Sequence, residues 1–242
     1  MSKLKGFVIQ RGISWIDGAP FVAILTLESS NRKTGNMAQV WIMRDDINPV
    51  EAVQTGKDVT ICGNCPHRKQ QDGSRSCYVN VGQGPNSIWK AYKRGIYPDA
   101  LFDGEYNETW NKMINALTNK RIRWGAYGDP AILCSAMVDY LNSKAQGHTG
   151  YTHQWRNEYA QDFKGIFQAS CDGFNDYLCA SDLGWKTFTV VSTNAHPNYA
   201  KQCPATVESS EAHCITCKLC DGARSDIYVH AHGSGQKYVT AV

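Results

Sequence analysis

Three closely spaced cysteines near the end of the chain have the spacing of a metal-binding loop. Cys214, Cys217 and Cys220 are each separated by two residues, which places three thiolates on one tight turn. Zn²⁺ accepts four Cys or three Cys and one His, and an all-cysteine set also suits a [4Fe–4S] cluster. The candidates for the fourth ligand are Cys203, His230 and His232. The alternative is a group of reduced structural thiols without a metal.

A second cysteine group lies in the first third of the chain. Cys62 and Cys65 are two residues apart, and Cys77 follows after a longer interval, with His67 as a candidate fourth ligand. Residues 68–76 between them are polar and unsuited to a core. Closing such a loop costs entropy that metal binding can offset, so the group predicts a second metal site. A filled set of four protein ligands favours a structural metal over a catalytic one.

The remaining three of the ten cysteines occur singly, which is typical of small buried side chains. No apolar run follows the basic residues at the start, so no signal peptide is expected, and metal ligation is favoured over disulfides in a cytoplasmic protein. The longest apolar stretches, such as residues 20–25, fall far short of the roughly 20 residues that span a membrane. We therefore expect no membrane partner.

The 242 residues carry a net charge of +3, and the basic side chains are grouped. Such groups suit a phosphate backbone, because each neutralised phosphate releases counterions. The alternative is a solvated helix face with no ligand. The candidate DNA-binding residues are Lys90, Lys93, Arg94, Lys120, Arg121 and Arg123.

The first sixty residues predict an antiparallel β segment. Runs rich in Val, Ile, Phe and Trp are separated by turn residues, and Asp17-Gly18 is a strong hairpin signal. Strands are expected over 6–16, 20–27, 37–43 and 58–61, with a short helix over 48–53. The segment 1–60 is thus expected to precede an α/β catalytic domain over 61–242.

Helices and strands alternate from about residue 86. Helices are expected over 87–93, 108–119, 131–143 and 174–183, and strands over 122–127, 150–155, 165–171 and 187–191. Alternation of this kind predicts parallel strands with right-handed crossovers. The predicted class is therefore α/β with a parallel core, either an open sheet or a (β/α) barrel.

Polar side chains follow several of the predicted strands. Asp129, His153 and Asp172 each lie where a strand ends. Because reactive groups in parallel α/β folds collect at the carboxyl ends of the strands, these three are expected on one rim. Simpler interpretations are that Asp129 caps the helix that begins at Pro130 and that Asp172 lies in a turn.

Several uncommon strings occur in an order that resembles the bacteriophage DNA-guanine transglycosylases. These proteins place 7-deazaguanine bases into DNA and look like distant relatives of the tRNA-guanine transglycosylases. The strings are Cys-Gly-Asn-Cys-Pro at 62–66, Cys-Tyr-Val-Asn-Val-Gly-Gln-Gly-Pro at 77–85, Arg-Trp-Gly-Ala-Tyr-Gly-Asp-Pro at 123–130, Thr-Gly-Tyr-Thr-His-Gln-Trp at 149–155, and the cysteines at 203, 214, 217 and 220.

The resemblance implies a reduced TIM barrel, because the chain is far shorter than the tRNA enzymes. It also implies a zinc set of three cysteines and a histidine, for which Cys214, Cys217, Cys220 and His232 match in type and order but not in spacing. The first cysteine group has no counterpart in the tRNA enzymes. A phage-encoded protein of this kind would act in the host cytoplasm.

The family exchanges a base at C1′ with two aspartates, one as nucleophile and one as proton shuttle. The natural pair here is Asp129 and Asp172, with the two roles left open. A base must leave the stack to be exchanged, so stacking and edge-reading side chains are expected around it. The candidates are Asn80, Gln83, Tyr127, Tyr151, His153, Gln154 and Trp155.

Two other functions compete with base exchange. An iron–sulfur radical enzyme acting on nucleotides would carry Cys-x3-Cys-x2-Cys, a spacing that is absent here. A zinc-stabilised module that binds nucleic acid without catalysis would use the two cysteine groups as knuckles. Knuckles need no alternating α/β scaffold, which favours the enzyme.

Overall fold

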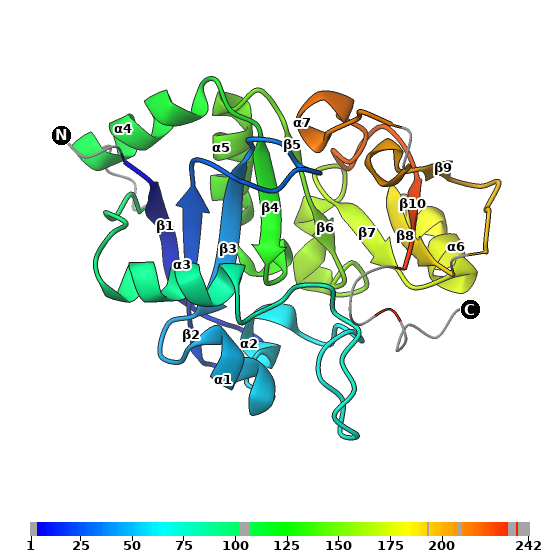
Figure 1. Ribbon diagram of the computed structural model, residues 1–242, viewed down its shortest axis with the longest axis horizontal. Helices are drawn as coiled ribbons and strands as arrows, with labels where there is room; N and C mark the ends of the chain where they lie inside the picture. Colours follow the sequence, from blue (N-terminus) through cyan, green and yellow to red (C-terminus); the bar gives the residue numbers. More distant parts are fainter. Residues whose placement is uncertain (1–3, 102–106, 193, 208–209, 232–235, 237–242) are drawn as a thin grey trace.

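The computed structural model describes residues 4–101, 107–192, 194–207, 210–231 and 236. It has a mixed α/β architecture with parallel strands, as the sequence predicts. Ten strands form two five-stranded sheets, with β1 to β5 in one half of the molecule and β6 to β10 in the other (Figure 1). Among the described residues no pairing closes these strands into a ring.

The first sheet begins with the predicted antiparallel strands. These are β1 (Gly6–Ile13), β2 (Pro20–Thr26) and β3 (Ala38–Arg44). Gly18 has φ of 71° in the β1–β2 turn, a backbone conformation that favours glycine. β3 then pairs in parallel with β4 (Ile122–Tyr127), which pairs with β5 (His148–Thr149). The N-terminal strands therefore share one sheet with the α/β region.

The second sheet is parallel throughout its recorded pairings. Its order is β6 (Tyr151–Thr152), β7 (Gln168–Cys171), β8 (Thr187–Val191), β10 (Ile227–His230) and β9 (Lys201–Gln202). Only Gly150 separates β5 from β6, so one extended segment runs from the first sheet into the second. A Cβ at Gly150 would lie 2.6 Å from the Phe167 ring, which explains the glycine at this junction.

The helices of the described chain are α1 (Pro49–Gln54), α2 (Val59–Cys62), α3 (Gly84–Lys93), α4 (Glu108–Leu117), α5 (Ser135–Lys144), α6 (Phe174–Asp182) and α7 (Cys214–Cys217). All but α2 and α7 lie near predicted positions. The helix expected over 131–143 begins only at Ser135, because a short 3-10 turn over Pro130–Ile132 precedes it. Asn48 and Asn107 cap α1 and α4 with their side-chain oxygens, as capping chemistry requires. No helix in the described part of the chain is long and apolar enough to cross a bilayer.

The strand predicted over residues 58–61 is wrong, because this segment forms α2. Its β-branched residues favour a strand, but Cys62 N–H donates to the Asp58 carbonyl at 3.0 Å and closes a helical turn. The same helix crosses the expected domain boundary between residues 60 and 61. Local propensity is overridden here by contacts with the first sheet.

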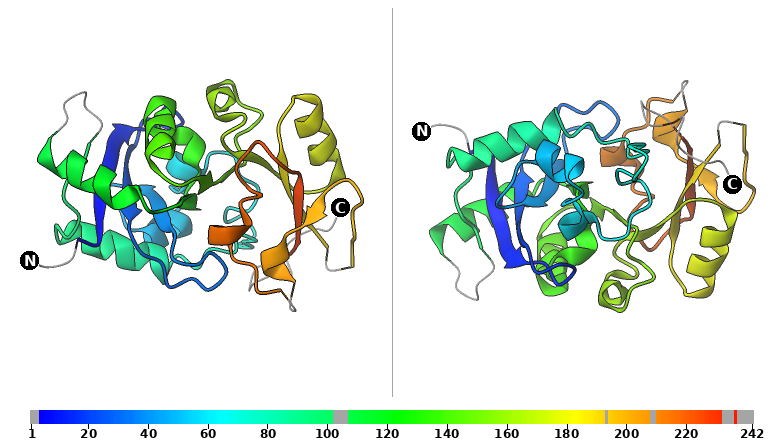
Figure 2. Two further views of the ribbon diagram at one scale, coloured as in Figure 1. Left: turned by 90° about the horizontal axis from the view of Figure 1, so that it is seen from above. Right: turned by 90° about the horizontal axis from the view of Figure 1, so that it is seen from below.

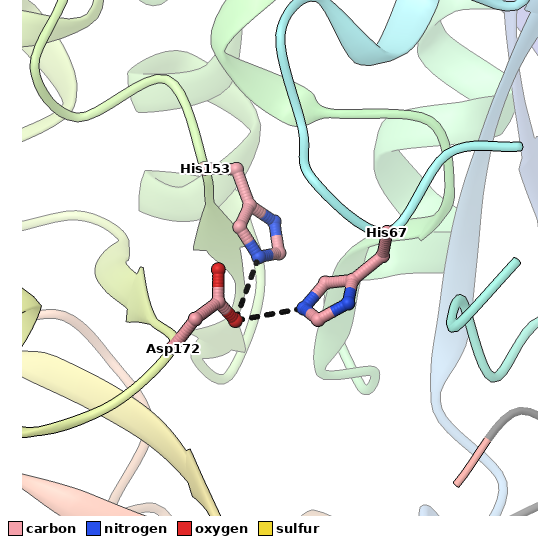
Figure 3. Close-up of side chains that lie close together, drawn as sticks. All are labelled: His67, His153 and Asp172. Atoms are coloured by element: carbon pink, nitrogen blue, oxygen red, sulfur yellow. Dashed lines mark hydrogen bonds and ion pairs between the residues drawn. The ribbon is translucent and has the colours of Figure 1, made fainter. Parts of the chain in front are cut away.

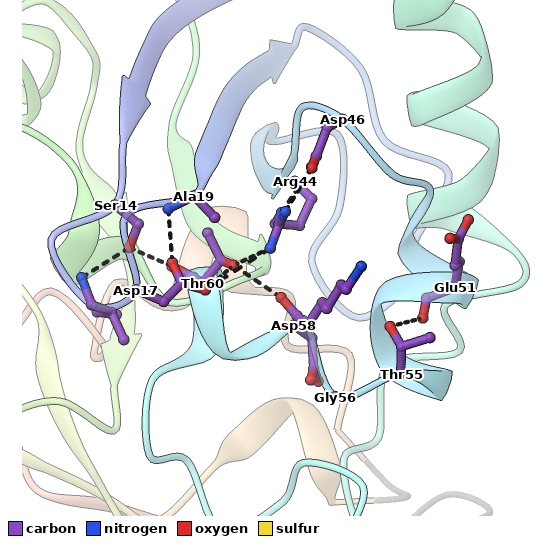
Figure 4. Close-up of polar contacts among 12 residues, drawn as sticks. Ser14, Asp17, Ala19, Arg44, Asp46, Glu51, Thr55, Gly56, Asp58 and Thr60 are labelled. Atoms are coloured by element: carbon purple, nitrogen blue, oxygen red, sulfur yellow. Dashed lines mark hydrogen bonds and ion pairs between the residues drawn. The ribbon is translucent and has the colours of Figure 1, made fainter.

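Those contacts centre on Arg44, whose side chain is 8% exposed at the end of β3 (Figure 4). Its guanidinium donates to both carboxylate oxygens of Asp46, at 2.8 and 2.6 Å, and to Thr60 Oγ1 at 2.8 Å. Thr60 donates in turn to Asp17 Oδ2, and Ser14 donates to the Thr60 carbonyl. The network fixes α2 on the sheet and so places the Cys62 that ends it.

The core fills both sides of the first sheet and continues to the second. Trp110 of α4 packs on Tyr140 of α5, and Trp124 of β4 donates from Nε1 to Asn142 Oδ1 at 2.9 Å. Both tryptophans are essentially buried. Seen from above and below, the segment between α2 and α3 lies between the two halves (Figure 2). That segment carries the first cysteine group to the ends of the strands.

Candidate functional site

Three polar residues predicted to share a rim lie together at the carboxyl ends of β4, β6 and β7. The Asp129 carboxylate accepts from the His153 backbone N–H at 2.8 Å. The His153 imidazole Nε2 lies 3.7 Å from Asp172 Oδ1. The predicted grouping of Asp129, His153 and Asp172 is therefore present, and it joins the ends of strands from both sheets, since β4 belongs to the first sheet and β6 and β7 to the second.

Asp129 is held by a complete set of hydrogen bonds. Its Oδ1 accepts from the Ala131 backbone N–H at 3.0 Å and from Thr152 Oγ1 at 2.7 Å, while Oδ2 accepts from His153. The side chain is only 7% exposed, and burial raises the pKa of its carboxyl above the usual range. Asp129 therefore caps the short 3-10 turn over Pro130–Ile132 and connects the ends of β4 and β6.

Asp172 has a different environment at the end of β7. His67 Nε2 donates to its Oδ1 at 2.7 Å, and His153 approaches the same oxygen (Figure 3). Burial acts to raise the pKa of Asp172, but the interactions with His153 and His67 outweigh it and hold that pKa well below the usual range. The side chain is 25% exposed, so this carboxylate is ionised and reachable.

The loop that follows α2 brings His67 to Asp172. Cys77 N–H donates to the His67 carbonyl at 3.0 Å, which closes the loop, and Gln154 Nε2 donates to the Cys62 carbonyl at 2.9 Å. Gly63 has φ of 54°, and a Cβ there would lie 2.5 Å from Gln154 Oε1. The loop is thus packed closely against the end of β6.

The first cysteine group lies beside this rim. Burial raises the pKa of the Cys62 thiol well above its usual value, with Cys65 and Cys77 as charged neighbours. Burial lowers the pKa of His153, but the charge of Cys65 and the Asp172 carboxylate raise it well above its usual range. Within the described residues, the three donors found within 4.8 Å of one another are His67, His153 and Asp172. His67, a candidate ligand of this cysteine group, contacts Asp172 instead.

The second cysteine group surrounds a small cavity of about 20 Å³. Cys203, Cys214, Cys217 and Cys220 all line it, and burial raises the pKa of the Cys220 thiol. Of the three candidates for the fourth ligand, Cys203 is the one that lines this space. The His230 Nε2 lies 2.9 Å from the Ala195 carbonyl oxygen, and His232 lies outside the described residues.

The predicted base-reading residues are dispersed. Trp155 is completely buried and donates from Nε1 to the Ser170 carbonyl at 3.0 Å, so it belongs to the core. Gln154 is also buried, and its Oε1 accepts from Asn157 and Tyr159. Tyr127 is buried at the end of β4, and the Tyr151 ring lies 4.1 Å from that of Phe188.

Two further predicted base-reading residues lie at the start of α3. Asn80 is exposed, and its Oδ1 accepts from the Gly82 backbone N–H at 3.1 Å. Gln83 is also exposed and immediately precedes the helix. No recorded contact in the described part of the chain joins either residue to the rim. They form part of the surface beside it.

The predicted basic residues divide between surface and interior. Lys90, Lys93 and Arg94 are exposed on or just after α3. Lys120 is partly exposed, whereas Arg121 is 6% exposed and lines the cavity of the second cysteine group. Arg123 donates to the Tyr78 hydroxyl at 2.9 Å. The α3 group is therefore the exposed set, and within it Lys93 Nζ lies 3.3 Å from Asp45 Oδ1, which offsets part of its charge.

An open groove of about 690 Å³ lies beside Gly63 and Gln154. Trp15, which is 54% exposed, forms one wall, and its ring centroid lies 5.7 Å from that of Tyr159. The other lining residues include Asn64, Asn157 and Glu158. The exposed Trp15 ring, with the half-buried Tyr159 and amides beside it, offers a stacking surface for a flat ligand. The sequence signal that could have predicted this groove is Trp15, because a large apolar residue in a hairpin turn cannot pack into the core.

The chain has no match among protein families, curated proteins or solved structures.

Proposed function

We propose that this protein exchanges guanine in DNA for a 7-deazaguanine base, with Asp172 as the attacking carboxylate. The observation that carries the proposal is the ionised, accessible Asp172 at the end of β7, hydrogen bonded to His67 and approached by His153. Asp129 fits a positioning role better than a reacting one, because its two oxygens already accept three hydrogen bonds. The reduced barrel implied by the resemblance stays part of this proposal.

The chemistry has two steps. The Asp172 carboxylate attacks C1′ of a deoxyguanosine, the bond from C1′ to the base breaks, and the departing guanine takes a proton from the nearby imidazole of His153. The incoming 7-deazaguanine then loses its ring N–H proton to the same imidazole and attacks C1′, which releases the carboxylate. Two displacements retain the configuration of the sugar, as in other double-displacement glycosyl transfers.

The groove beside Gly63 supports a binding place for a base that has left the duplex. Stacking on Trp15 and Tyr159 would compensate for the lost stacking in DNA, and Asn64 and Asn157 offer amide groups at the groove wall. The exposed Lys90, Lys93 and Arg94 on and after α3 suit contacts with phosphates.

We assign a structural zinc to Cys203, Cys214, Cys217 and Cys220. The support for this assignment is that all four cysteines line one small cavity. Four thiolates leave no open position for a substrate, which fits a structural role. The metal content tests this assignment directly, since a brown protein containing iron and sulfide would instead indicate a [4Fe–4S] cluster.

The test of function is incorporation of a labelled 7-deazaguanine base into a DNA duplex. Protein with zinc bound at Cys203, Cys214, Cys217 and Cys220 should transfer the label and release guanine in equal amounts, and Asp172→Asn should abolish both. Asp139→Asn, an exposed substitution on α5, is the matched control and should leave transfer unchanged. Tight DNA binding with no transfer under any metal loading would refute the enzyme and favour a non-catalytic zinc module.

A further inference from the structure

Three metal-binding side chains from distant segments meet at one point of the rim. His67 comes from the loop after α2, His153 from the end of β6, and Asp172 from the end of β7. One nitrogen or oxygen of each lies within 4.8 Å of the others (Figure 3). Two imidazoles and one carboxylate therefore face a common space.

The Nε2 of His153 is buried and makes no hydrogen bond within normal distance. It lies 3.7 Å from Asp172 Oδ1, which is an ion-pair separation. A buried polar atom without a hydrogen bond costs free energy. A cation between the two side chains would accept a bond from His153 Nε2 and another from the Asp172 carboxylate.

Each of the three residues makes a further contact, through the side chain in His67 and through the backbone in His153 and Asp172. The His67 Nδ1 lies 2.7 Å from Ser76 Oγ, so when a metal replaces the proton on Nε2, the remaining proton on Nδ1 can be held by Ser76. The backbone N–H of His153 donates to Asp129, and that of Asp172 donates to Asp176 Oδ2 at 3.2 Å. Such supporting contacts are typical of ligands in metal sites.

We propose that His67, His153 and Asp172 bind one divalent transition-metal ion, separate from the metals of the cysteine groups. Two imidazoles with one carboxylate suit Zn²⁺, Fe²⁺, Co²⁺ or Mn²⁺ better than Mg²⁺ or Ca²⁺, which prefer oxygen. Three protein ligands leave a position open for water or another small ligand. The side chains are 16%, 21% and 25% exposed, so an ion has a path to the site.

Binding of this ion does not depend on the function proposed above. If that function holds, however, the ion and the sugar C1′ would compete for the Asp172 carboxylate. Loading the site would then inhibit base exchange, and removing the ion would restore it.

The test is a Co²⁺ titration of protein whose cysteine sites are already filled with Zn²⁺. One additional equivalent of Co²⁺ should bind at the proposed site. It should give weak visible bands without the strong thiolate-to-cobalt absorption that a cysteine site produces. His67→Gln and Asp172→Asn should lose this equivalent, and Ser76→Ala should weaken it by roughly tenfold or more. His196→Gln changes an exposed histidine outside the group and serves as the control.

Circular dichroism and the urea midpoint of each variant report whether it is folded. Equal Co²⁺ binding by wild type and folded Asp172→Asn would overturn the inference, as would a further equivalent with thiolate absorption only. Because the readout is spectroscopic, a failure of base exchange leaves this result unaffected.

Discussion

Replacing Asp129 by asparagine separates its structural role from a chemical one. The carboxylate accepts three buried hydrogen bonds, from Ala131, Thr152 and His153. Asparagine can keep the two on its oxygen side, but its NH₂ group would face the His153 N–H as donor against donor. Each hydrogen bond to a charged group contributes about 1.5–3 kcal/mol, and the neutral side chain recovers part of the desolvation cost. We expect a net loss of about 2 kcal/mol in the free energy of unfolding.

Urea denaturation followed by circular dichroism measures this loss. With a denaturant slope of about 3 kcal/mol per molar for a chain of this size, the midpoint should fall by about 0.7 M. Base exchange should also fall, by roughly 10–100-fold, because His153 loses its backbone anchor and shifts relative to Asp172. Asp139→Asn on exposed α5 should change neither quantity.

The comparison with Asp172→Asn decides the assignment. That variant should abolish exchange completely, and its urea midpoint should also fall, because a carboxylate whose pKa is lowered in the folded state stabilises the fold. An Asp129→Asn protein with an unchanged midpoint and no exchange at all would refute the reasoning. Asp129 would then be the reacting carboxylate, and its hydrogen bonds would be those of a poised nucleophile.

Three further predictions test the supports of the site. Arg44→Met should lower the free energy of unfolding by about 2 kcal/mol, measured in urea, because it breaks a charge pair that is half shielded from water. Gly63→Ala should lower the free energy of unfolding by about 1–3 kcal/mol, measured by thermal melting, because the new Cβ collides with Gln154 and the residue has a positive φ. Gly73→Ala should lower it less, because Gly73 also has a positive φ but open space around it. Cys217→Ser should reduce bound zinc by one per chain in elemental analysis, and unchanged zinc would exclude this cysteine as a ligand.

The sequence predicts most strands and helices because their patterns are local. The strands over 122–127 and 187–191 match β4 and β8 residue for residue, since each is short, apolar and bounded by turn residues. The failure at 58–61 has a physical cause in Arg44 and Ser14, which hold Thr60 from distant strands. Propensity describes a segment, whereas these contacts belong to the whole fold.

The site divides in the same way. The common rim of Asp129, His153 and Asp172 can be predicted from strands that end in polar residues. The sequence carries no periodic signal for the fact that the rim spans two sheets, for the hydrogen bonds around Asp129, or for the contact between His67 and Asp172 across 105 residues. Trp155 is predicted to contact the base but is buried in the core, because an aromatic residue at a strand end can equally fill the core.

The passage of one extended segment through Gly150 has a consequence for folding kinetics. Asp129 belongs to the first sheet and Asp172 to the second, and His153 lies three residues beyond the junction. The cluster of His67, His153 and Asp172 therefore forms only when both sheets and the loop after α2 have assembled. Contacts of such long sequence separation form late, because their loop-closure entropy must be overcome first. Recovery of Co²⁺ binding during refolding should accordingly lag behind recovery of secondary structure.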